Sequence, residues 1–108
     1  MTPEGRVKAK VKKALATLPR KYAFMPVQMG MGAPGLDFYC CIGALFVAIE
    51  TKVPGKHLTE RQVQTANAIV DAGGAVYVIR EQYDVDQMMR DLTRGFIVSA
   101  VYDTLPPV

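Results

Sequence analysis

The chain has 108 residues, of which 50% are hydrophobic and 21% are charged, and its formal net charge at pH 7 is +3. This length predicts one domain, residues 1–108, and this composition excludes a disordered chain. No apolar run approaches the ~18 residues that a bilayer-spanning helix needs, and the basic N-terminus has no apolar signal core. We therefore expect a cytoplasmic protein without a membrane partner.

The positive charge is concentrated near the N-terminus. Residues 1–21 contain seven of the thirteen basic residues and a single acid, Glu4, whereas the remaining 87 residues contain six basic and nine acidic groups. A basic segment on a mildly acidic body suggests a polyanionic partner, held through phosphate neutralisation and counterion release. The alternative is a solvated helix face that contributes only solubility.

The first 19 residues predict a helix. Thr2 can cap this helix with Pro3 at its first position, and Pro19 ends it. Glu4 lies in the first turn, where a negative charge is favourable to the helix dipole. The residues that recur at helical spacing form its core stripe, and the lysines lie on the other faces: Val7, Val11, Ala14, Leu15 and Leu18.

The next segment predicts a weak strand and a loop. Residues 22–28 form an edge or irregular strand, because Pro26 cannot donate to a strand ladder. Residues 29–35 contain three glycines and a proline, but not at the spacing of a nucleotide-binding loop, so no nucleotide cofactor is expected. The glycines either allow a nucleic-acid backbone to come close or form a plain tight turn.

The chain is organised around residues 37–52, which predict two apolar strands joined at Gly43-Ala44. Glycine at the first central position favours a two-residue type II′ turn. Such a turn places Ile42 opposite Leu45, and counting outward places Asp37 opposite Glu50. Because side chains alternate along a strand, Lys52 lies on the same face as these two carboxylates.

Two opposed carboxylates at the end of an apolar hairpin repel each other. A divalent cation between Asp37 and Glu50 would remove this repulsion, since Mg²⁺ is typically held by one or two carboxylates with waters and phosphates. The alternative is an ordinary solvated hairpin end, in which Lys52 pairs with a carboxylate.

Cys40 and Cys41 are adjacent in the first of these strands and point to opposite faces. They cannot form a useful disulfide, and the sequence has no Cys/His set at zinc spacing. We expect two small buried side chains in a reducing compartment.

The rest of the chain alternates helices and strands. Thr59 and Gln62 form a capping box that opens a helix closed by Gly73-Gly74, and residues 75–79 predict a buried central strand. Asp84, with Gln87 at the capping-box position, is expected to cap a third helix that Gly95 ends. The apolar stripes of the two helices are Val63, Ala66, Ala68, Ile69 and Val70, and Val85, Met88, Met89 and Leu92.

Residues 96–102 form either a last strand or a hydrophobic arm that pairs with another subunit. The predicted order of helices and strands is αβββαβαβ. Helices interleaved among strands indicate an α/β domain with a mixed sheet.

The residues at the hairpin end also carry a family resemblance. An acidic residue on one strand, followed by Glu-x-Lys at the end of the next, resembles the signature of the PD-(D/E)XK nuclease superfamily. Residues 32–37 and 50–62 are similar to its VRR-NUC branch, the virus-type replication–repair nucleases, small stand-alone forms of which occur in phages. The likeness covers about residues 4–80. It departs from the family at Leu36, where the family often has proline.

This resemblance implies a restriction-endonuclease-like fold, a mixed β-sheet flanked by helices, and a metal-dependent endodeoxyribonuclease. Lys52 would orient or deprotonate the attacking water or stabilise the phosphate. Gln62 would be either the cap partner or the helix-borne glutamine that the family places beside the catalytic lysine. The ligands of Mg²⁺ or Mn²⁺ would be Asp37, Glu50, the backbone carbonyl of Thr51 and, at a second site or through water, Glu4.

DNA would be held through its backbone, because nothing in the sequence offers base-edge recognition. His57, without a serine or cysteine partner, is either DNA-facing or solvated. The remaining DNA contacts are expected from the first helix and the turn after the hairpin: Arg6, Lys8, Lys10, Lys12, Lys13 and Lys56.

The resemblance also implies an oligomeric state and a substrate. Stand-alone members resemble dimeric enzymes that cut four-way (Holliday) junctions, so we expect a homodimer that acts on branched DNA. Its interface is expected in residues 96–102 or in the Met88/Met89 helix. The alternative from another class is a catalytically silent DNA-binding or phage structural protein on the same fold.

Overall fold

The computed structural model describes residues 1–27, 35–94 and 101–102. The order of helices and strands is the predicted one, αβββαβαβ. The elements are α1 (Pro3–Leu15), β1 (Lys21–Phe24), β2 (Phe38–Ile42), β3 (Leu45–Thr51), α2 (Glu60–Asp71), β4 (Ala75–Ile79), α3 (Gln82–Arg94) and β5 (Val101–Tyr102).

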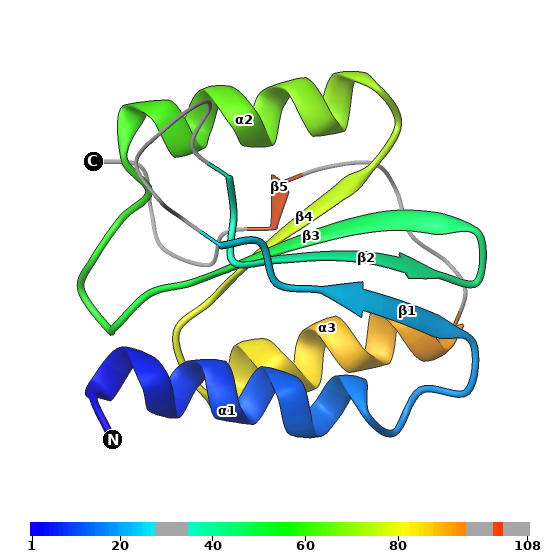
Figure 1. The fold of residues 1–108 in the computed structure, drawn as a ribbon, viewed down its shortest axis with the longest axis horizontal. Coiled ribbons are helices and arrows are strands. Elements are labelled where there is room, and N and C mark those ends of the chain that lie inside the picture. The colour runs from blue at the N-terminus through cyan, green and yellow to red at the C-terminus, as the bar shows by residue number, and fades with distance from the viewer. Residues whose placement is uncertain (28–34, 95–100, 103–108) are drawn as a thin grey trace.

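The strands form one mixed sheet in the order β1-β2-β3-β4-β5. Strand β2 is antiparallel to both β1 and β3, whereas β4 is parallel to both β3 and β5. Helices α1 and α3 cover one face of the sheet and α2 covers the other, which gives three layers (Figure 1). The predicted α/β fold with a mixed sheet flanked by helices is confirmed.

The β2–β3 hairpin has the predicted register but a different turn. Ile42 lies opposite Leu45 and Phe38 opposite Ile49, one residue short of the Asp37–Glu50 pair. Gly43 and Ala44 have φ angles of 52° and 73°. Because both are positive, the turn is type I′ rather than type II′. The two-residue loop length, which sets the register, is the same in both types.

The larger core lies between the sheet and α1 and α3. Thr2 caps α1 by accepting a hydrogen bond from the Gly5 N–H, as predicted. The predicted stripes of α1 and α3 face this core, with Ala14 and Met89 only partly buried. Met88 is fully buried there and is not available for contact with another subunit, whereas Met89 is only partly buried, so an interface through the Met88/Met89 helix stays a prediction.

A smaller core lies between the sheet and α2, and it covers less than the sequence suggested. Ala66 is buried against Ala48, but Val63 is 42% exposed and Ala68 is also exposed, so the predicted apolar face of α2 is too wide. Cys41 is exposed next to Phe46, because α2 leaves this part of the sheet uncovered.

The two cysteines therefore differ, and the prediction that both are buried is wrong. Cys40 faces the larger core on the other side of β2. Burial raises the pKa of the Cys40 thiol to about 11, so this thiol stays protonated and unreactive at neutral pH.

Helix α3 begins earlier than predicted. It starts at Gln82, so Asp84 lies inside its first turn rather than at the cap. The Oδ2 atom of Asp84 instead accepts a hydrogen bond from the Arg80 N–H at 3.0 Å, just after β4 ends. Asp84 therefore ties the start of α3 to the end of the central strand.

Two predicted features lie largely outside the described residues: the loop 29–35, of which only Gly35 is described, and the end of α3 at Gly95 with residues 96–100. The described part of the predicted last strand, Val101–Tyr102, pairs in parallel with β4. Within the described ranges, the helices are too short and too polar to cross a bilayer.

Candidate metal centre

Three carboxylates converge where the β2–β3 hairpin ends, opposite its turn. Asp37 immediately precedes β2, Glu50 is the last residue but one of β3, and Glu4 lies in the first turn of α1. One carboxylate oxygen from each of the three residues lies within 4.8 Å of the others. Glu4 is exposed, Asp37 is half-buried and Glu50 is 3% exposed, so the cluster extends from the protein interior to its surface.

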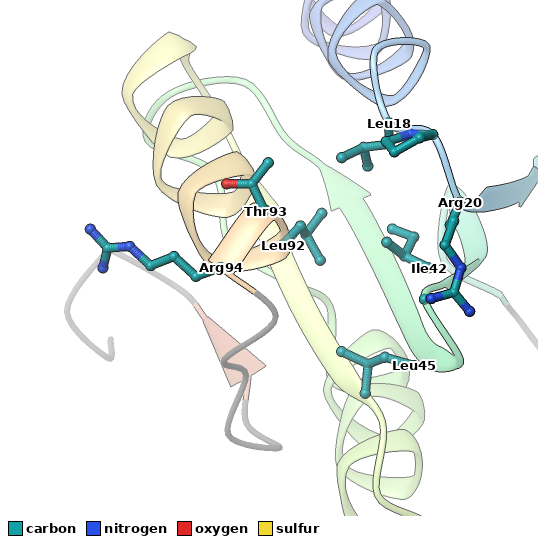
Figure 2. A pocket seen from close by; sticks show the side chains of 9 residues that line it. Leu18, Arg20, Ile42, Leu45, Leu92, Thr93 and Arg94 are labelled. Atoms are coloured by element: carbon teal, nitrogen blue, oxygen red, sulfur yellow. The ribbon is translucent and has the colours of Figure 1, made fainter.

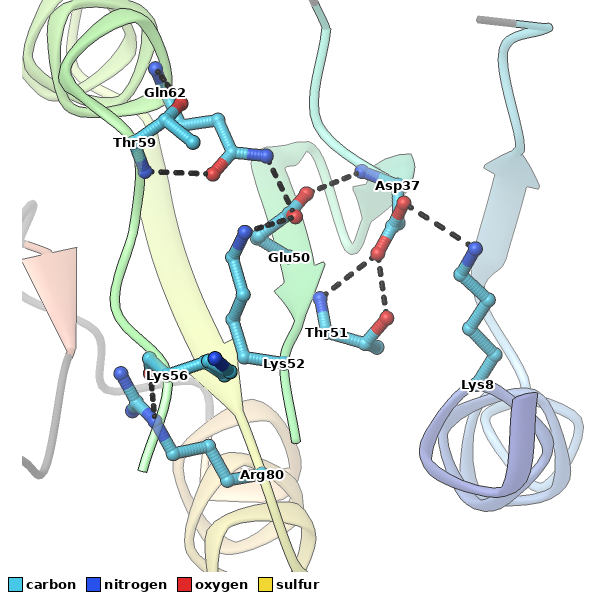
Figure 3. Close-up of polar contacts among 9 residues, drawn as sticks. All are labelled: Lys8, Asp37, Glu50, Thr51, Lys52, Lys56, Thr59, Gln62 and Arg80. Atoms are coloured by element: carbon cyan, nitrogen blue, oxygen red, sulfur yellow. Dashed lines mark hydrogen bonds and ion pairs between the residues drawn. The ribbon is translucent and has the colours of Figure 1, made fainter. Parts of the chain in front are cut away.

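The carboxylate of Asp37 has two differently occupied oxygens (Figure 3). Its Oδ2 atom accepts hydrogen bonds from the Thr51 N–H at 2.9 Å and from the Thr51 hydroxyl at 2.5 Å. Its Oδ1 atom lies 3.7 Å from the Nζ of Lys8, which is one helical turn after Glu4. Asp37 therefore joins β3 to the basic helix α1.

The carboxylate of Glu50 is bound on both oxygens. Oε1 accepts a hydrogen bond from the Asp37 N–H at 3.1 Å, and Oε2 accepts one from the Gln62 Nε2 at 2.8 Å. The Nζ of Lys52 lies 3.6 Å from Oε2. Burial, reinforced by the negative charge of Asp37 and partly opposed by Lys52, raises the pKa of Glu50 to about 7.

The side chain of Gln62 makes the predicted capping contact and, at the same time, reaches the carboxylate that lies beside Lys52. Its Oε1 accepts a hydrogen bond from the Thr59 N–H at 2.9 Å, and its own N–H donates to the Thr59 hydroxyl at 3.2 Å, which completes the predicted capping box. Its Nε2 donates to Glu50 at the same time. The assumption that the side chain serves only one role was wrong, because the two ends of an amide can bind different partners.

The expected DNA-binding residues lie on two segments, helix α1 and the turn between β3 and α2. Lys8 reaches the cluster directly, through Asp37. Lys56 and His57 are exposed in the turn between β3 and α2. The other basic side chains of α1 are also exposed: Arg6, Lys10, Lys12 and Lys13.

Two groups near the cluster were not singled out by the sequence. The side chain of Thr51 was overlooked because only its backbone carbonyl was considered. Arg80 is 4% exposed, and its Nε donates to the carbonyl of Lys56 at 2.9 Å, which holds the turn after β3 against the end of β4. The sequence did offer a signal for Arg80, because a basic residue that directly follows a predicted buried strand lies at the edge of the sheet where other functional side chains were expected.

A pocket of about 540 Å³ lies at the opposite end of the hairpin (Figure 2). Ile42 and Leu45, which flank the turn, line it together with Leu92, and Arg20 and Arg94 also contribute. None of the described residues that line this pocket carries a carboxylate. The pocket is therefore separate from the acidic cluster.

The chemistry of the acidic cluster fits a hard divalent cation. Mg²⁺ and Mn²⁺ prefer carboxylate, carbonyl and water oxygens, and the cluster offers three carboxylates on two secondary-structure layers. The hydrogen bonds to Asp37 and Glu50 orient both groups without help from an ion. Such preorganisation is expected of residues that hold a metal.

Comparison with protein-family models found no match, and comparison with curated proteins found none either. Among solved structures, the chain is similar to one described as "VRR_NUC domain", with a TM-score of 0.72 and 18% sequence identity. The similarity covers 83% of this chain and 97% of that chain. The chain therefore has the fold of a VRR_NUC domain, as its sequence resemblance implied.

Proposed function

We propose that this chain is a metal-dependent DNA endonuclease of the VRR-NUC family that hydrolyses phosphodiester bonds. The observation that carries the proposal is the convergence of Glu4, Asp37 and Glu50 within 4.8 Å, with Lys52 3.6 Å from Glu50. Opposed carboxylates with an adjacent lysine suit phosphate chemistry, in which negative charge must be offset and a water activated. The likeness in fold to a VRR_NUC domain supports the same conclusion.

Asp37 and Glu50 would hold the Mg²⁺ or Mn²⁺, with the backbone carbonyl of Thr51 as a further ligand and Glu4 at a second site or through water. When bound, the ion lowers the pKa of a coordinated water and offsets charge on the reacting phosphate. Gln62 orients Glu50, and Thr51 orients Asp37.

Lys52 would act on the substrate side of the cluster. Its ammonium group is largely buried and is held beside Glu50, so it can orient the attacking water, move its proton or stabilise charge on the phosphate. The site is partly removed from solvent. Charge interactions in such a site are stronger than in bulk water, so the ammonium group can stabilise negative charge more effectively there.

The DNA backbone would lie along α1. Lys8 marks the point at which the basic helix meets the cluster, and the exposed lysines beyond it continue the positive charge away from it. Contacts of this kind bind DNA without reading its sequence, so the structure of the substrate is the proposed basis of selection.

Four-way or related branched DNA is the proposed substrate and a homodimer the proposed form. The described part of the chain contains one such centre, whereas resolving a junction needs two nicks in opposed strands, which a two-fold dimer can place symmetrically. The proposed interface segments are the helix that carries Met89 and residues 96–102, whose described part forms the last strand of the sheet.

The proposal is tested with labelled four-way junction, flap and linear duplex, each incubated with the purified protein in Mg²⁺, Mn²⁺ or EDTA. We expect cleavage only with metal, with the junction cut preferentially, and a light-scattering mass about twice 11.8 kDa. Binding without cleavage under every condition would favour a catalytically silent DNA-binding protein. A monomer that cuts junction and duplex equally would remove the resolvase and dimer proposals but leave the metal nuclease.

A further inference from the structure

The side chain of Thr51 is buried beside the acidic cluster and has one described partner there. Thr51 is the last residue of β3 and is 0% exposed. Its hydroxyl donates to Asp37 Oδ2 at 2.5 Å, the short distance expected for a hydroxyl bound to an ionised carboxylate. The adjacent N–H of Thr51 donates to the same oxygen at 2.9 Å.

The backbone that carries these two donors is held in place. Thr51 pairs with Ile79 of β4, and the following Lys52 N–H donates to the Ile79 carbonyl at 3.0 Å. Every residue of β4 is buried. The donors of Thr51 are therefore attached to a strand that pairs with the buried strand β4 rather than to a loop.

Two fixed donors on one oxygen orient the whole carboxylate. The χ2 torsion of aspartate is broad, so a free carboxylate turns easily. With Oδ2 held by Thr51, the other oxygen, Oδ1, is turned towards α1, where Lys8 lies 3.7 Å away. Oδ1 is thus the oxygen that remains for a cation.

We propose that the Thr51 hydroxyl is a positioning group, which fixes the Asp37 carboxylate so that Oδ1 is presented to the divalent cation. This inference rests on the proposed function and adds to the backbone carbonyl of Thr51 a separate role for its side chain. A hydroxyl that acts on a metal ligand typically changes metal affinity about 10- to 100-fold when it is removed. The predicted effect is therefore on metal binding before any effect on chemistry.

Two matched pairs of proteins isolate the hydroxyl: wild type with Thr51→Val, and Thr51→Ser with Thr51→Ala. Thr51→Val replaces the hydroxyl with a methyl group of similar shape, and Thr51→Ser keeps it while removing a methyl group. Thr51→Ala differs from Thr51→Ser only by the hydroxyl, so this second pair tests the same group if the valine variant does not fold. None of these changes alters the backbone N–H or carbonyl.

The experiment is a titration of each protein with Mn²⁺ alone, by calorimetry, without DNA. Thermal unfolding in EDTA identifies the folded variants. We expect Thr51→Val to bind Mn²⁺ about tenfold more weakly than wild type, the lower end of the range for such groups. Thr51→Ala should be weaker than Thr51→Ser by a similar factor, with Thr51→Ser close to wild type. The metal concentration for half-maximal DNA cleavage should rise in the same order.

The outcomes separate this inference from the proposed function. If wild type binds Mn²⁺ and the two members of each pair bind it with equal affinity, the role of the hydroxyl is overturned and the metal centre stands. A wild-type protein that binds no Mn²⁺ would overturn the proposed function, and the inference with it.

Discussion

The amide of Gln62 connects Glu50 to the first turn of α2. Its Nε2 donates to Glu50 Oε2 at 2.8 Å, while its Oε1 accepts the Thr59 N–H at 2.9 Å. Because a backbone N–H can only donate, the oxygen end of the amide must face Thr59 and the NH₂ end must face Glu50. A helix cap therefore sets the orientation of a buried carboxylate.

This connection predicts that stability and activity can be separated. Gln62→Glu keeps an oxygen for the Thr59 N–H but removes the donor to Glu50 and adds a negative charge, so DNA cleavage should fall at least about tenfold. Thr59→Ala removes the cap hydroxyl and should cost about 1 kcal/mol in the free energy of unfolding, with cleavage retained. Urea unfolding and cleavage rates measure the two effects. Full activity in Gln62→Glu would show that the contact with Glu50 is not functional.

Lys8 should differ from the other lysines of α1 in its effect on metal binding. Its Nζ lies 3.7 Å from Asp37 Oδ1, so it repels a cation bound there, and Lys8→Gln should strengthen Mn²⁺ binding. Lys12→Gln is the matched control, because Lys12 is on the same helix and exposed. Calorimetric titration with Mn²⁺ measures both. Equal affinities in Lys8→Gln and wild type would remove Lys8 from the centre.

The exposed lysines of α1 should determine how DNA binding depends on salt. Each phosphate contact that is lost should flatten the plot of log K against log[salt] by about 0.9 for duplex DNA. The triple change of Lys10, Lys12 and Lys13 to Gln tests this, with Arg94→Gln at the opposite end of the hairpin as the control. An unchanged slope in the triple variant would mean that the basic helix face contributes only solubility.

The parts of the fold that follow from local pattern were predicted correctly. The helical stripe of α1, the capping box at Thr59 and the buried run of β4 are short-range features, and the two-residue turn places Asp37 opposite Glu50 by counting. The turn type was missed because Ala44 adopts a positive φ angle that alanine rarely takes.

The features that depend on tertiary packing were harder to predict. Which face of α2 is covered depends on how far the helix extends over the sheet, and no periodicity in the sequence encodes that distance. The approach of Glu4 to Asp37 depends on how α1 docks, and the family resemblance rather than the spacing pointed to it. The hydroxyl of Thr51 could not be distinguished from any other strand threonine until its partner was known.

The raised pKa of Glu50 predicts how stability depends on pH without metal. Between the ordinary pKa of 4.5 and about 7, the unfolded chain holds fewer protons at this site than the folded one, so stability falls as pH rises through that range. The full effect is on the order of 3 kcal/mol. Glu50→Gln removes it, so wild type should lose more stability than Glu50→Gln between pH 5 and pH 8, as measured by urea unfolding in EDTA. Parallel pH curves for the two proteins would contradict the assignment.

The central claim is that Asp37 ligates a metal that the hydrolysis of DNA requires. Asp37→Asn tests it sharply. The Thr51 donors should bind the amide oxygen, which turns the NH₂ group, unable to ligate a cation, towards the metal position.

The measurement is the cleavage rate of a labelled four-way junction by wild type and Asp37→Asn, with Mg²⁺ and with EDTA, alongside DNA affinity. We predict that wild type cleaves only with Mg²⁺, and that Asp37→Asn binds the junction at least as tightly but does not cleave it. Cleavage by wild type in EDTA, or by Asp37→Asn at the wild-type rate, would contradict the metal mechanism.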